Sequence, residues 1–364
     1  MPRALDRELW GLLCCTVDHG ALNFIGAAGG GASGSGGSNG GEFVCATCGG
    51  KFPVRGGVPV FLHADASLFE GNEFEWVHPM AARGGVAGAA RQLFRKLRLA
   101  TSVNLAARGN YARLAKLALK QSARPVVLVV GGAEVGRGLE EFLGDSRFTF
   151  IESDVYFGNR VNLVADGHEL PLKAGSVDVV ICQAVLQHVA DPVRCVGEMW
   201  RVLKSGGLVY GEVPFMQQVH GGAYDFCRFS RSGCRRLFRN FEEESSGMVA
   251  GAGTVLAWSV EYFFRSFSDS AKWHRLTRRV TPLFTFWLKY FDYVFKNVRS
   301  AEDGASCSYF LGKKNEKEIA DRDIVRMYWA NATAGAANAV PSEPSHRMNP
   351  SRTYTEFPES GLNR

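Results

Sequence analysis

The sequence predicts an α/β fold, because apolar strand-like runs alternate with stretches of helical length. The run PVVLVV leads into the glycine-rich turn GGAEVGRG, and a second run, RFTFIESD, follows it and ends in acidic residues. Two further runs, SVDVVICQ and GGLVYGEV, enclose the helical stretch DPVRCVGEMWRVLK. Short apolar runs bounded by turn residues indicate buried strands, and strands that alternate with helices are typical of a parallel sheet.

The first strand runs into a turn that carries four glycines. This strand is predicted to begin at Val126, and Gly131, Gly132, Gly136 and Gly138 follow it. Because glycine has no Cβ, the backbone can turn sharply there and come close to a ligand. We therefore expect a nucleotide-like cofactor at this turn. The alternative is a tight connection without a ligand, since glycine motifs also occur where nothing binds.

Acidic residues follow the next two apolar runs. Asp154 falls about twenty residues beyond the glycine turn, where a nucleotide site places a carboxylate for a ribose diol. Glu152 is a rival for this role, and the spacing to Asp166 favours Asp154. Asp166 comes just after the short apolar run in NLVADGHELPL, and its carboxylate can accept a hydrogen bond from the exocyclic amine of an adenine.

The later elements follow the same alternation. The helix that begins at DPVRC is predicted to end at Lys204 and Ser205, because the glycine pair at 206–207 is a C-terminal stop signal. LVYGEV begins another strand directly after it, and CSYFLGKK at 307–314 is expected to be the last strand of the fold.

Taken in order, these motifs resemble class I S-adenosylmethionine-dependent methyltransferases of the type 11 kind. The matching motifs between Pro125 and Phe215 are VVGGAEVGRG, ESD, ADGHELPL, DVVICQAVLQHVADP and EMWRVLKSGGLVYGEVPF. The resemblance implies a doubly wound, Rossmann-like, mostly parallel sheet with the cofactor at the C-terminal ends of its strands. The chain departs from the family at Val129, where an acidic residue is usual, and at Ala133 in the glycine motif.

The resemblance also implies which residues hold S-adenosylmethionine. Glycines of the turn would face its methionine part, and Asp154, with Glu152 as its rival, would bind its ribose. Asp166 would bind its adenine, and Gln183 with Ala184 would face its sulfonium side. The implied cofactor-binding residues are Gly131, Gly132, Gly136, Glu152, Asp154, Asp166, Gly167, Gln183 and Ala184.

Two cysteine-bearing segments near the N-terminus, LLCCTVDHGAL and FVCATCGGKFPVRGGVPVF, resemble the two knuckles of short zinc-ribbon segments. These segments are related to the small activator subunit of tRNA and protein methyltransferases. Cys45 and Cys48 match the second knuckle, Cys15 holds the first ligand position, and Asp18 stands where the next cysteine is expected. A carboxylate is an acceptable zinc ligand, so these four residues are the candidate zinc site.

Alternatives to this zinc site stay open at the level of sequence. Cys14 and His19 are possible substitute ligands, and the ribbon could instead persist without metal by packing its apolar residues. Residues 1–65 are assigned to this ribbon-like module, which contains a glycine-serine insert at 26–41 that is expected to form a flexible loop.

The remaining chain divides into three predicted parts. Residues 66–120 are expected to form a helical linker or cap, within which RQLFRKLRLA at 91–100 reads as an amphipathic helix. The methyltransferase-like domain spans 121–315, with an aromatic helical insert at 255–297 expected in the core or acceptor pocket and, as the alternative, on a membrane surface. Residues 316–364 are expected to be a mostly disordered tail.

Composition limits the classes of partner. The 42 lysines and arginines exceed the 36 acidic residues by six in 364 residues, without a dense basic block, so no clear nucleic-acid patch is predicted. No apolar run is long enough for a transmembrane helix, and no export signal is recognised. Five scattered cysteines are typical of a reduced protein, so a cytoplasmic location is expected. The sequence does not define an oligomeric state.

The loop after the strand LVYGEVP is predicted to meet the acceptor, since a rigid sheet places such loops at the site. His220, Tyr224 and Arg228 in this loop, with His188 in QHVADP, are the candidate catalytic residues. The alternative is that the loop aromatics only seat the next helix and that His188 only orients a loop.

The sequence therefore predicts methyl transfer from S-adenosylmethionine to a small-molecule acceptor or to one linked to a glycan or lipid. Two other classes are alternatives. A glycine turn with a ribose carboxylate also fits an NAD-dependent oxidoreductase, although the G-x-G-x-x-G spacing is missing. A non-catalytic scaffold would use the ribbon as a docking module.

Overall fold

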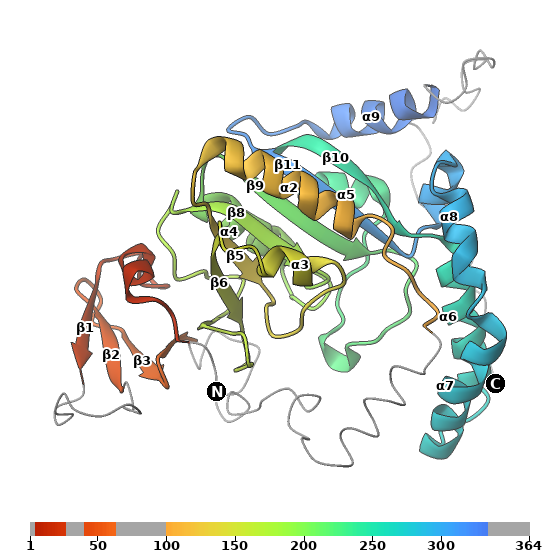
Figure 1. Ribbon diagram of the computed structural model, residues 1–364, viewed down its shortest axis with the longest axis horizontal. Coiled ribbons are helices and arrows are strands. Elements are labelled where there is room, and N and C mark those ends of the chain that lie inside the picture. The colour runs from red at the N-terminus through yellow and green to blue at the C-terminus, as the bar shows by residue number, and fades with distance from the viewer. Residues whose placement is uncertain (1–3, 27–39, 63–99, 334–364) are drawn as a thin grey trace, which may run out of the picture.

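The computed structural model describes residues 4–26, 40–62 and 100–333, and its centre is a single twisted sheet (Figure 1). Within these residues the sheet has eleven strands in the order β1-β2-β3-β4-β7-β6-β5-β8-β9-β11-β10. The strands are β1 (Leu22–Gly26), β2 (Gly41–Cys45), β3 (Lys51–Arg55), β4 (Val58–Phe61), β5 (Val126–Val130), β6 (Thr149–Asp154), β7 (Leu163–Ala165), β8 (Val177–Gln183), β9 (Leu203–Pro214), β10 (Phe241–Ala250) and β11 (Cys307–Lys314).

Helices cover both faces of the sheet. Helices α2 and α3 share one buried apolar cluster with the strands, and α4 and α5 share another on the opposite face. The helices are η1 (Arg7–Leu12), α2 (Ala107–Gln121), α3 (Leu139–Leu143), α4 (Pro192–Val202), η3 (Gly222–Tyr224), α5 (Arg231–Leu237), α6 (Ala252–Arg265), α7 (Ala271–Thr285), η4 (Leu288–Tyr290), α8 (Phe291–Phe295), η5 (Arg299–Gly304) and α9 (Asp321–Thr333).

The central strands confirm the predicted doubly wound, mostly parallel sheet. Strands β7, β6, β5, β8 and β9 are parallel neighbours, and β11 enters antiparallel between β9 and β10. The chain moves outward from β5 to β6 and β7 in one direction and to β8 and β9 in the other. Because this reversal leaves a crevice beyond the C-terminal ends of β5 and β8, the topology fixes where a ligand can bind.

The N-terminal strands extend the same sheet. Strands β1 to β4 form an antiparallel set, and β4 pairs in parallel with β7 through Val60–Val164 and Phe61–Ala165. Phe61 also belongs to the apolar cluster that contains Leu163 and Leu172 of the central domain. The ribbon-like module is therefore built onto the edge of the central domain, at the end opposite α6, α7 and α8 (Figure 1).

Helix α4 illustrates how local sequence sets the boundaries. Asp191 caps its N-terminus by accepting a hydrogen bond from the backbone N–H of Arg194, and Pro192 occupies the first turn. The helix ends at Val202, short of the predicted end at Lys204 and Ser205. The reason is that Leu203 is already extended and pairs with Val177 in the sheet.

Some of the predicted segments lie outside the described residues, and one of them differs from its prediction. The insert at 26–41, the amphipathic helix at 91–100 and most of the linker before α2 lie largely outside the described residues. The predicted tail from residue 316 is corrected in part, since residues 321–333 form α9, which packs against α5 and buries Ile324.

The aromatic insert differs from its predicted place in the core. Many large side chains of α6, α7 and α8 are exposed, with Phe284 at 70% and Phe267 at 67% exposure. Aromatic composition alone does not define which face of a helix is buried. Among the described residues no helix is both long and apolar enough to cross a membrane.

Candidate functional site

A cavity of about 460 Å³ opens beyond the C-terminal ends of β5, β6, β7 and β8. This volume lies in the range of about 300–1,000 Å³ that is usual for small-molecule sites. Its walls come from the glycine turn, the ends of the strands and the loop after β9. The lining residues are Val130, Gly131, Ala133, Glu134, Ser153, Asp154, Val155, Tyr156, Ala165, Asp166, Gly167, His168, Ala184, Val185, His188, Val189, His220, Gly221 and Tyr224.

The glycine turn closes one wall of the cavity and requires glycine at Gly131. This residue has a φ of 80°, and a Cβ there would lie 2.2 Å from Cγ2 of Val185. The backbone N–H groups of Gly131 and Gly132 both donate to the carbonyl oxygen of Ser153, at 2.9 and 2.8 Å. A Cβ at Gly132 would lie 3.1 Å from Cβ of Glu152. The turn is therefore held tightly against β6, with Gly131 at the cavity and Gly132 behind it.

The two rival carboxylates lie in different surroundings. Asp154 lines the cavity, and its side chain accepts hydrogen bonds from the backbone N–H groups of Ala133 at 3.0 Å and Tyr156 at 3.3 Å. Glu152 is only 1% exposed and forms a two-point ion pair with Arg160, at 2.7 and 3.0 Å. The structure places Asp154 at the cavity, whereas Glu152 is occupied by its arginine.

Asp166 and Gly167 also line the cavity, beside His168, which was not among the residues predicted from the sequence. His168 Nδ1 lies 2.6 Å from Asp166 Oδ1, and His168 Nε2 accepts the backbone N–H of Asp191 at 3.1 Å. Since Nε2 accepts, Nδ1 carries the proton and donates it to the carboxylate. Burial opposes the charge on Asp166, yet the bonds from His168 lower the pKa of this carboxyl, and the carboxylate raises the pKa of His168.

Besides Gly132 and Glu152, two more of the predicted cofactor residues, Gly136 and Gln183, do not line the cavity. Gln183 is turned toward the protein interior, where it accepts from the Tyr111 hydroxyl at 3.0 Å and donates to Glu212 at 3.0 Å. Gly136 lies against this amide, since a Cβ there would be 2.0 Å from Gln183 Oε1. Ala184 does line the cavity, and its φ of 56° is rare for a residue with a side chain.

A buried carboxylate stands behind the cavity, at the centre of a hydrogen-bond network. Glu212 is 3% exposed and accepts from the Tyr210 hydroxyl at 2.6 Å, from Gln183, and from the Asn104 amide at 3.2 Å. Burial raises the pKa of Glu212 against the opposing effect of these three bonds. The Asn104 side-chain oxygen in turn accepts the backbone N–H of Ala107, at the start of α2. The network thus joins the entry to α2, the sheet and the support of the glycine turn.

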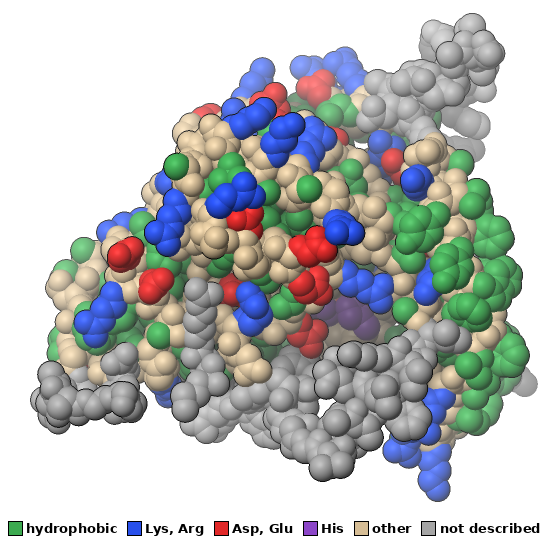
Figure 2. Space-filling model, viewed as in Figure 1, with side chains coloured by type: hydrophobic (Ala, Val, Ile, Leu, Met, Phe, Trp, Pro, Cys, Tyr) green, Lys and Arg blue, Asp and Glu red, His purple; other side chains and the backbone are tan. Residues whose placement is uncertain are grey.

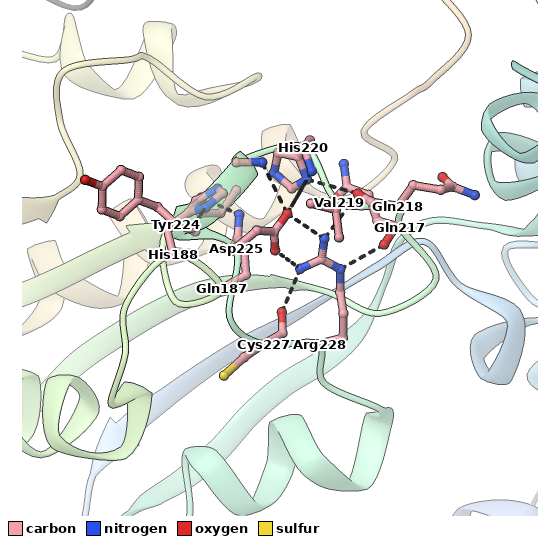
Figure 3. Close-up of polar contacts among 12 residues, drawn as sticks. Gln187, His188, Gln217, Gln218, Val219, His220, Tyr224, Asp225, Cys227 and Arg228 are labelled. Atoms are coloured by element: carbon pink, nitrogen blue, oxygen red, sulfur yellow. Dashed lines mark hydrogen bonds and ion pairs between the residues drawn. The ribbon is translucent and has the colours of Figure 1, made fainter. Parts of the chain in front are cut away.

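The loop after β9 contributes His220 and Tyr224 to the cavity, where they meet His188. Figure 3 shows His220 and Tyr224 of this loop beside His188. His188 Nδ1 lies 2.7 Å from the carbonyl oxygen of Tyr224, so this nitrogen donates and Nε2 keeps the lone pair when the ring is neutral. The ring of His220 meets that of His188 edge to face, with centroids 4.9 Å apart, and burial lowers the pKa of His220. Two imidazoles therefore face the same space.

Arg228 is the one candidate catalytic residue that does not line the cavity. Its guanidinium forms a two-point ion pair with Asp225 and donates to the carbonyl oxygens of Gln217 at 2.8 Å and Gln218 at 3.1 Å (Figure 3). Asp225 also accepts the backbone N–H of His220 at 2.8 Å. The bonds from Arg228 hold the pKa of Asp225 well below its usual range. All of these contacts lie within the loop, so Arg228 fixes the loop that presents His220.

Comparison with known proteins finds a family match within the central domain. Residues 146–211 match a protein family described as Methyltransferase domain. They contain β6, β7, β8 and α4 together with most of β9, and the cavity-lining residues at the ends of β6, β7 and β8 fall within this range. Over this stretch the chain is similar to methyltransferase domains.

Curated relatives match only short stretches of the chain. A protein of unknown role from a Streptomyces fradiae transposon is 52% identical over 50 residues, which are 14% of this chain and 14% of that protein. An uncharacterized chloroplastic methyltransferase of Arabidopsis thaliana is 40% identical over 65 residues, which are 17% of this chain and 18% of that protein. The chain spans less than a fifth of each relative.

Solved structures resemble the chain at low identity. A phosphoethanolamine N-methyltransferase of Haemonchus contortus is 14% identical, with a TM-score of 0.35 over 58% of this chain and 55% of that one. A chain from the Haloferax volcanii complex of the Trm112 methyltransferase activator is 17% identical, with a TM-score of 0.35 over 63% of this chain and 97% of that one.

Beside the methyltransferase domain, the ribbon brings the four candidate zinc ligands together. Ligand atoms of Cys15, Asp18, Cys45 and Cys48 all lie within 4.8 Å of one another. The Cys15 and Cys48 sulfurs are 3.6 Å apart, and the Cys45 sulfur lies 3.3 Å from Asp18 Oδ1. The substitute ligands considered from the sequence, Cys14 and His19, do not belong to this cluster.

Backbone N–H groups point at three of these sulfurs. Val17 donates to Cys15 at 3.4 Å, Thr47 to Cys45 at 3.4 Å, and Gly50 to Cys48 at 3.4 Å. Such bonds orient sulfur ligands and disperse the negative charge of thiolates. The cluster therefore has the donor atoms of a metal site and the supporting contacts around them.

Proposed function

We propose that the chain binds S-adenosylmethionine in the cavity of its methyltransferase domain and transfers a methyl group to an acceptor held at the same place. The observation that carries this proposal is the convergence of the Gly131 turn, Asp154 and Asp166 on one cavity, at the reversal point of the sheet. Backbone that approaches closely and two carboxylates at separate walls suit a ligand with several hydroxyl and amine donors.

The residues present fit this cofactor. Asp154 offers carboxylate oxygens to a ribose diol, and Asp166, held by His168, offers oxygens to an adenine amine. Gly131 and Val185 pack closely at the cavity, where a Cβ on Gly131 would lie 2.2 Å from Val185 Cγ2. When bound, S-adenosylmethionine supplies an electrophilic methyl group for a single in-line displacement.

The chain's own contribution is to position the acceptor and, where needed, to take its proton. Holding two reactants at near-attack distance and orientation supplies much of the rate gain in such a transfer. The loop at 215–228, fixed by Arg228, contributes His220, Gly221 and Tyr224 to the lining of the cavity. Nε2 of His188 and the ring of His220 are the atoms that can accept a proton from a hydroxyl or amine acceptor.

We further propose a polar small molecule, or the polar end of a glycan- or lipid-linked molecule, as the acceptor. His188, His220 and Tyr224 line the same cavity as Asp154 and Asp166. They offer hydrogen-bonding partners for a small polar group.

Calorimetry with S-adenosylmethionine, its demethylated product and NAD tests the proposal. We expect both methyltransferase ligands to bind and the Asp154→Ala variant to bind them about tenfold more weakly, because a charge-assisted bond to the ribose is lost. The Glu141→Ala variant, which removes an exposed carboxylate of α3, is the matched control and should bind as the unchanged chain does.

The other outcomes separate the alternatives. Tighter binding of NAD would favour an oxidoreductase, and binding of none of the three would favour a scaffold. If Asp154→Ala bound S-adenosylmethionine as tightly as the unchanged chain, the ribose contact would be assigned to Glu152. Glu152 would then have to break its ion pair with Arg160.

We also propose that the four-residue cluster of the ribbon binds one zinc ion. For Zn–S bonds of about 2.3 Å and Zn–O bonds of about 2.1 Å, the edges of a tetrahedron are about 3.8 Å between sulfurs and about 3.6 Å between sulfur and oxygen. The separations of 3.6 Å for Cys15–Cys48 and 3.3 Å for Cys45–Asp18 are close to these values. The donor set of three thiolates and one carboxylate fits zinc.

Metal analysis of the purified protein is expected to give about one zinc per chain. Cys45→Ser should lose most of this zinc and lower the melting temperature, since metal-binding free energy contributes to folding in small ribbons. Cys227→Ser, which removes a half-buried cysteine outside the cluster, should change neither. Absence of metal, with equal stability of the two variants, would show a metal-free ribbon.

A further inference from the structure

Helices α6, α7 and α8 form an exposed apolar face at the end of the molecule opposite the ribbon. Phe263, Phe267, Leu283, Phe284, Trp287 and Val294 are all about half exposed or more. Figure 2 shows hydrophobic side chains gathered over these helices along one side of the molecule. An apolar patch of this kind on a soluble surface marks an interaction site.

Helix α7 is built with its polarity reversed. Its buried side carries Thr277, Thr281 and Thr285, whose hydroxyls donate to helix carbonyls three or four residues back, at 2.8 to 3.1 Å. Its large apolar side chains, including Leu283 and Phe284, point outward. A helix at a water-facing surface has the opposite arrangement. The outward face of α7 is therefore suited to an apolar medium.

The three helices are fixed to one another, so this face is a defined surface. Asp292 of α8 is fully buried and accepts the backbone N–H groups of Gly253 at 2.8 Å and Thr254 at 3.2 Å, at the start of α6. The Thr254 hydroxyl also donates to this carboxylate at 2.6 Å. The apolar side chains are thus presented on a braced layer of helices.

Basic side chains accompany the apolar face. Residues 252–296 contain seven lysines and arginines and three acidic residues. Lys272, Arg275, Arg278 and Arg279 are exposed in the first part of α7, and blue side chains mark the lower end of the patch in Figure 2. Of the acidic residues, Asp292 is buried and Glu261 lies 4.0 Å from Arg265 and Arg278. The face carries net positive charge beside its aromatic residues.

We propose that α6, α7 and α8 are a docking surface for an anionic lipid bilayer, on which they lie without crossing it. Tryptophan, tyrosine and phenylalanine partition to the boundary between headgroups and acyl chains, and lysine and arginine are attracted to anionic headgroups. A second copy of the chain fits this surface less well, because a self-complementary contact needs acidic partners on the same face. The single well-exposed acidic residue on these three helices and their described connections is Asp269.

The docking surface adjoins the cavity. The Tyr262 hydroxyl of α6 donates to the carbonyl oxygen of Val219 at 2.8 Å, and Ser259 accepts from the Gln218 amide at 3.1 Å. Both bonds hold the loop that carries His220. Docking would therefore bring the acceptor side of the cavity near the headgroups. This last step rests on the proposed methyl transfer, whereas the docking itself does not.

Vesicle flotation of the full chain tests the docking. We expect the protein to float with vesicles of phosphatidylcholine and phosphatidylserine, to bind phosphatidylcholine alone at least tenfold more weakly, and to be released by added salt. The double variant Phe284→Glu, Trp287→Glu should bind the anionic vesicles at least tenfold more weakly. Val325→Glu, which changes a similarly exposed residue on α9, is the matched control and should float as the unchanged chain does.

A second variant separates the charge from the apolar contact. Replacing Arg275, Arg278 and Arg279 by glutamine should remove the preference for anionic vesicles. Melting temperature and S-adenosylmethionine affinity should be the same in all variants, so a failure of the proposed cofactor site would be seen apart from vesicle binding.

Three results would overturn the proposal. The first is no flotation with either kind of vesicle, and the second is flotation of the Phe284→Glu, Trp287→Glu variant equal to that of the unchanged chain. The third is a dimer that sedimentation detects in the absence of lipid and that this variant does not form. The dimer would assign the face to a second copy of the chain.

Discussion

Gly131→Ala is expected to weaken S-adenosylmethionine binding at least tenfold and to lower the melting temperature by several degrees. The backbone at Gly131 has a φ of 80°, where a residue with a Cβ is strained by about 1–2 kcal/mol. The new Cβ would also lie 2.2 Å from Val185 Cγ2, so the turn or Val185 has to move. Since both line the cavity, either shift alters the place where the cofactor binds. Calorimetry and thermal unfolding measure the two effects.

Gly175→Ala is the control for this substitution. Gly175 also has a positive φ, 65°, but a Cβ there meets nothing within 4 Å, and the residue does not line the cavity. We expect only the backbone strain, about 1 kcal/mol of unfolding free energy, and unchanged affinity. If Gly131→Ala bound the cofactor as well as Gly175→Ala does, the turn would not contact the cofactor.

Glu212→Ala is expected to be among the most destabilising single substitutions in the chain, at about 3–5 kcal/mol. Removal of the carboxylate leaves the buried Tyr210 hydroxyl and the half-buried amides of Gln183 and Asn104 without their shared acceptor. Each buried donor that loses its partner costs about 1–3 kcal/mol. Denaturant unfolding measures the loss.

Glu242→Ala provides the comparison, since Glu242 is an exposed glutamate on β10. Its loss should change the free energy of unfolding by no more than about 0.5 kcal/mol. A loss of less than about 1 kcal/mol for Glu212→Ala would mean that water or a rearranged side chain replaces the carboxylate.

The fold could be predicted because its determinants are local. The strand β5, the glycine turn and the acidic end of β6 are written in consecutive residues, and the structure places Gly131 and Asp154 together at the cavity. His168 could have been selected as well, since it stands two residues after Asp166 in the same motif. The cysteine cluster also follows from spacing, because each knuckle sets its ligands by a short turn.

The parts that were missed depend on contacts between distant residues. Asn104 meets Glu212 across 108 positions, which no local pattern reveals. Arg228 has the composition of a ligand-binding residue, yet Asp225 and two loop carbonyls occupy its donors. The aromatic helices were expected in the core because apolar composition does not show that threonines take the buried side of α7.

The pairing of β4 with β7 has a consequence for how the two proposed ligands influence one another. Phe61, at the end of the ribbon, is paired with Ala165, and Asp166 is the next residue in the chain. Zinc, by ordering the ribbon, would favour the arrangement of β7 that S-adenosylmethionine also selects. Zinc would then raise the affinity for S-adenosylmethionine although the two ligands are not in contact. By reciprocity, S-adenosylmethionine would raise the affinity for zinc by the same factor.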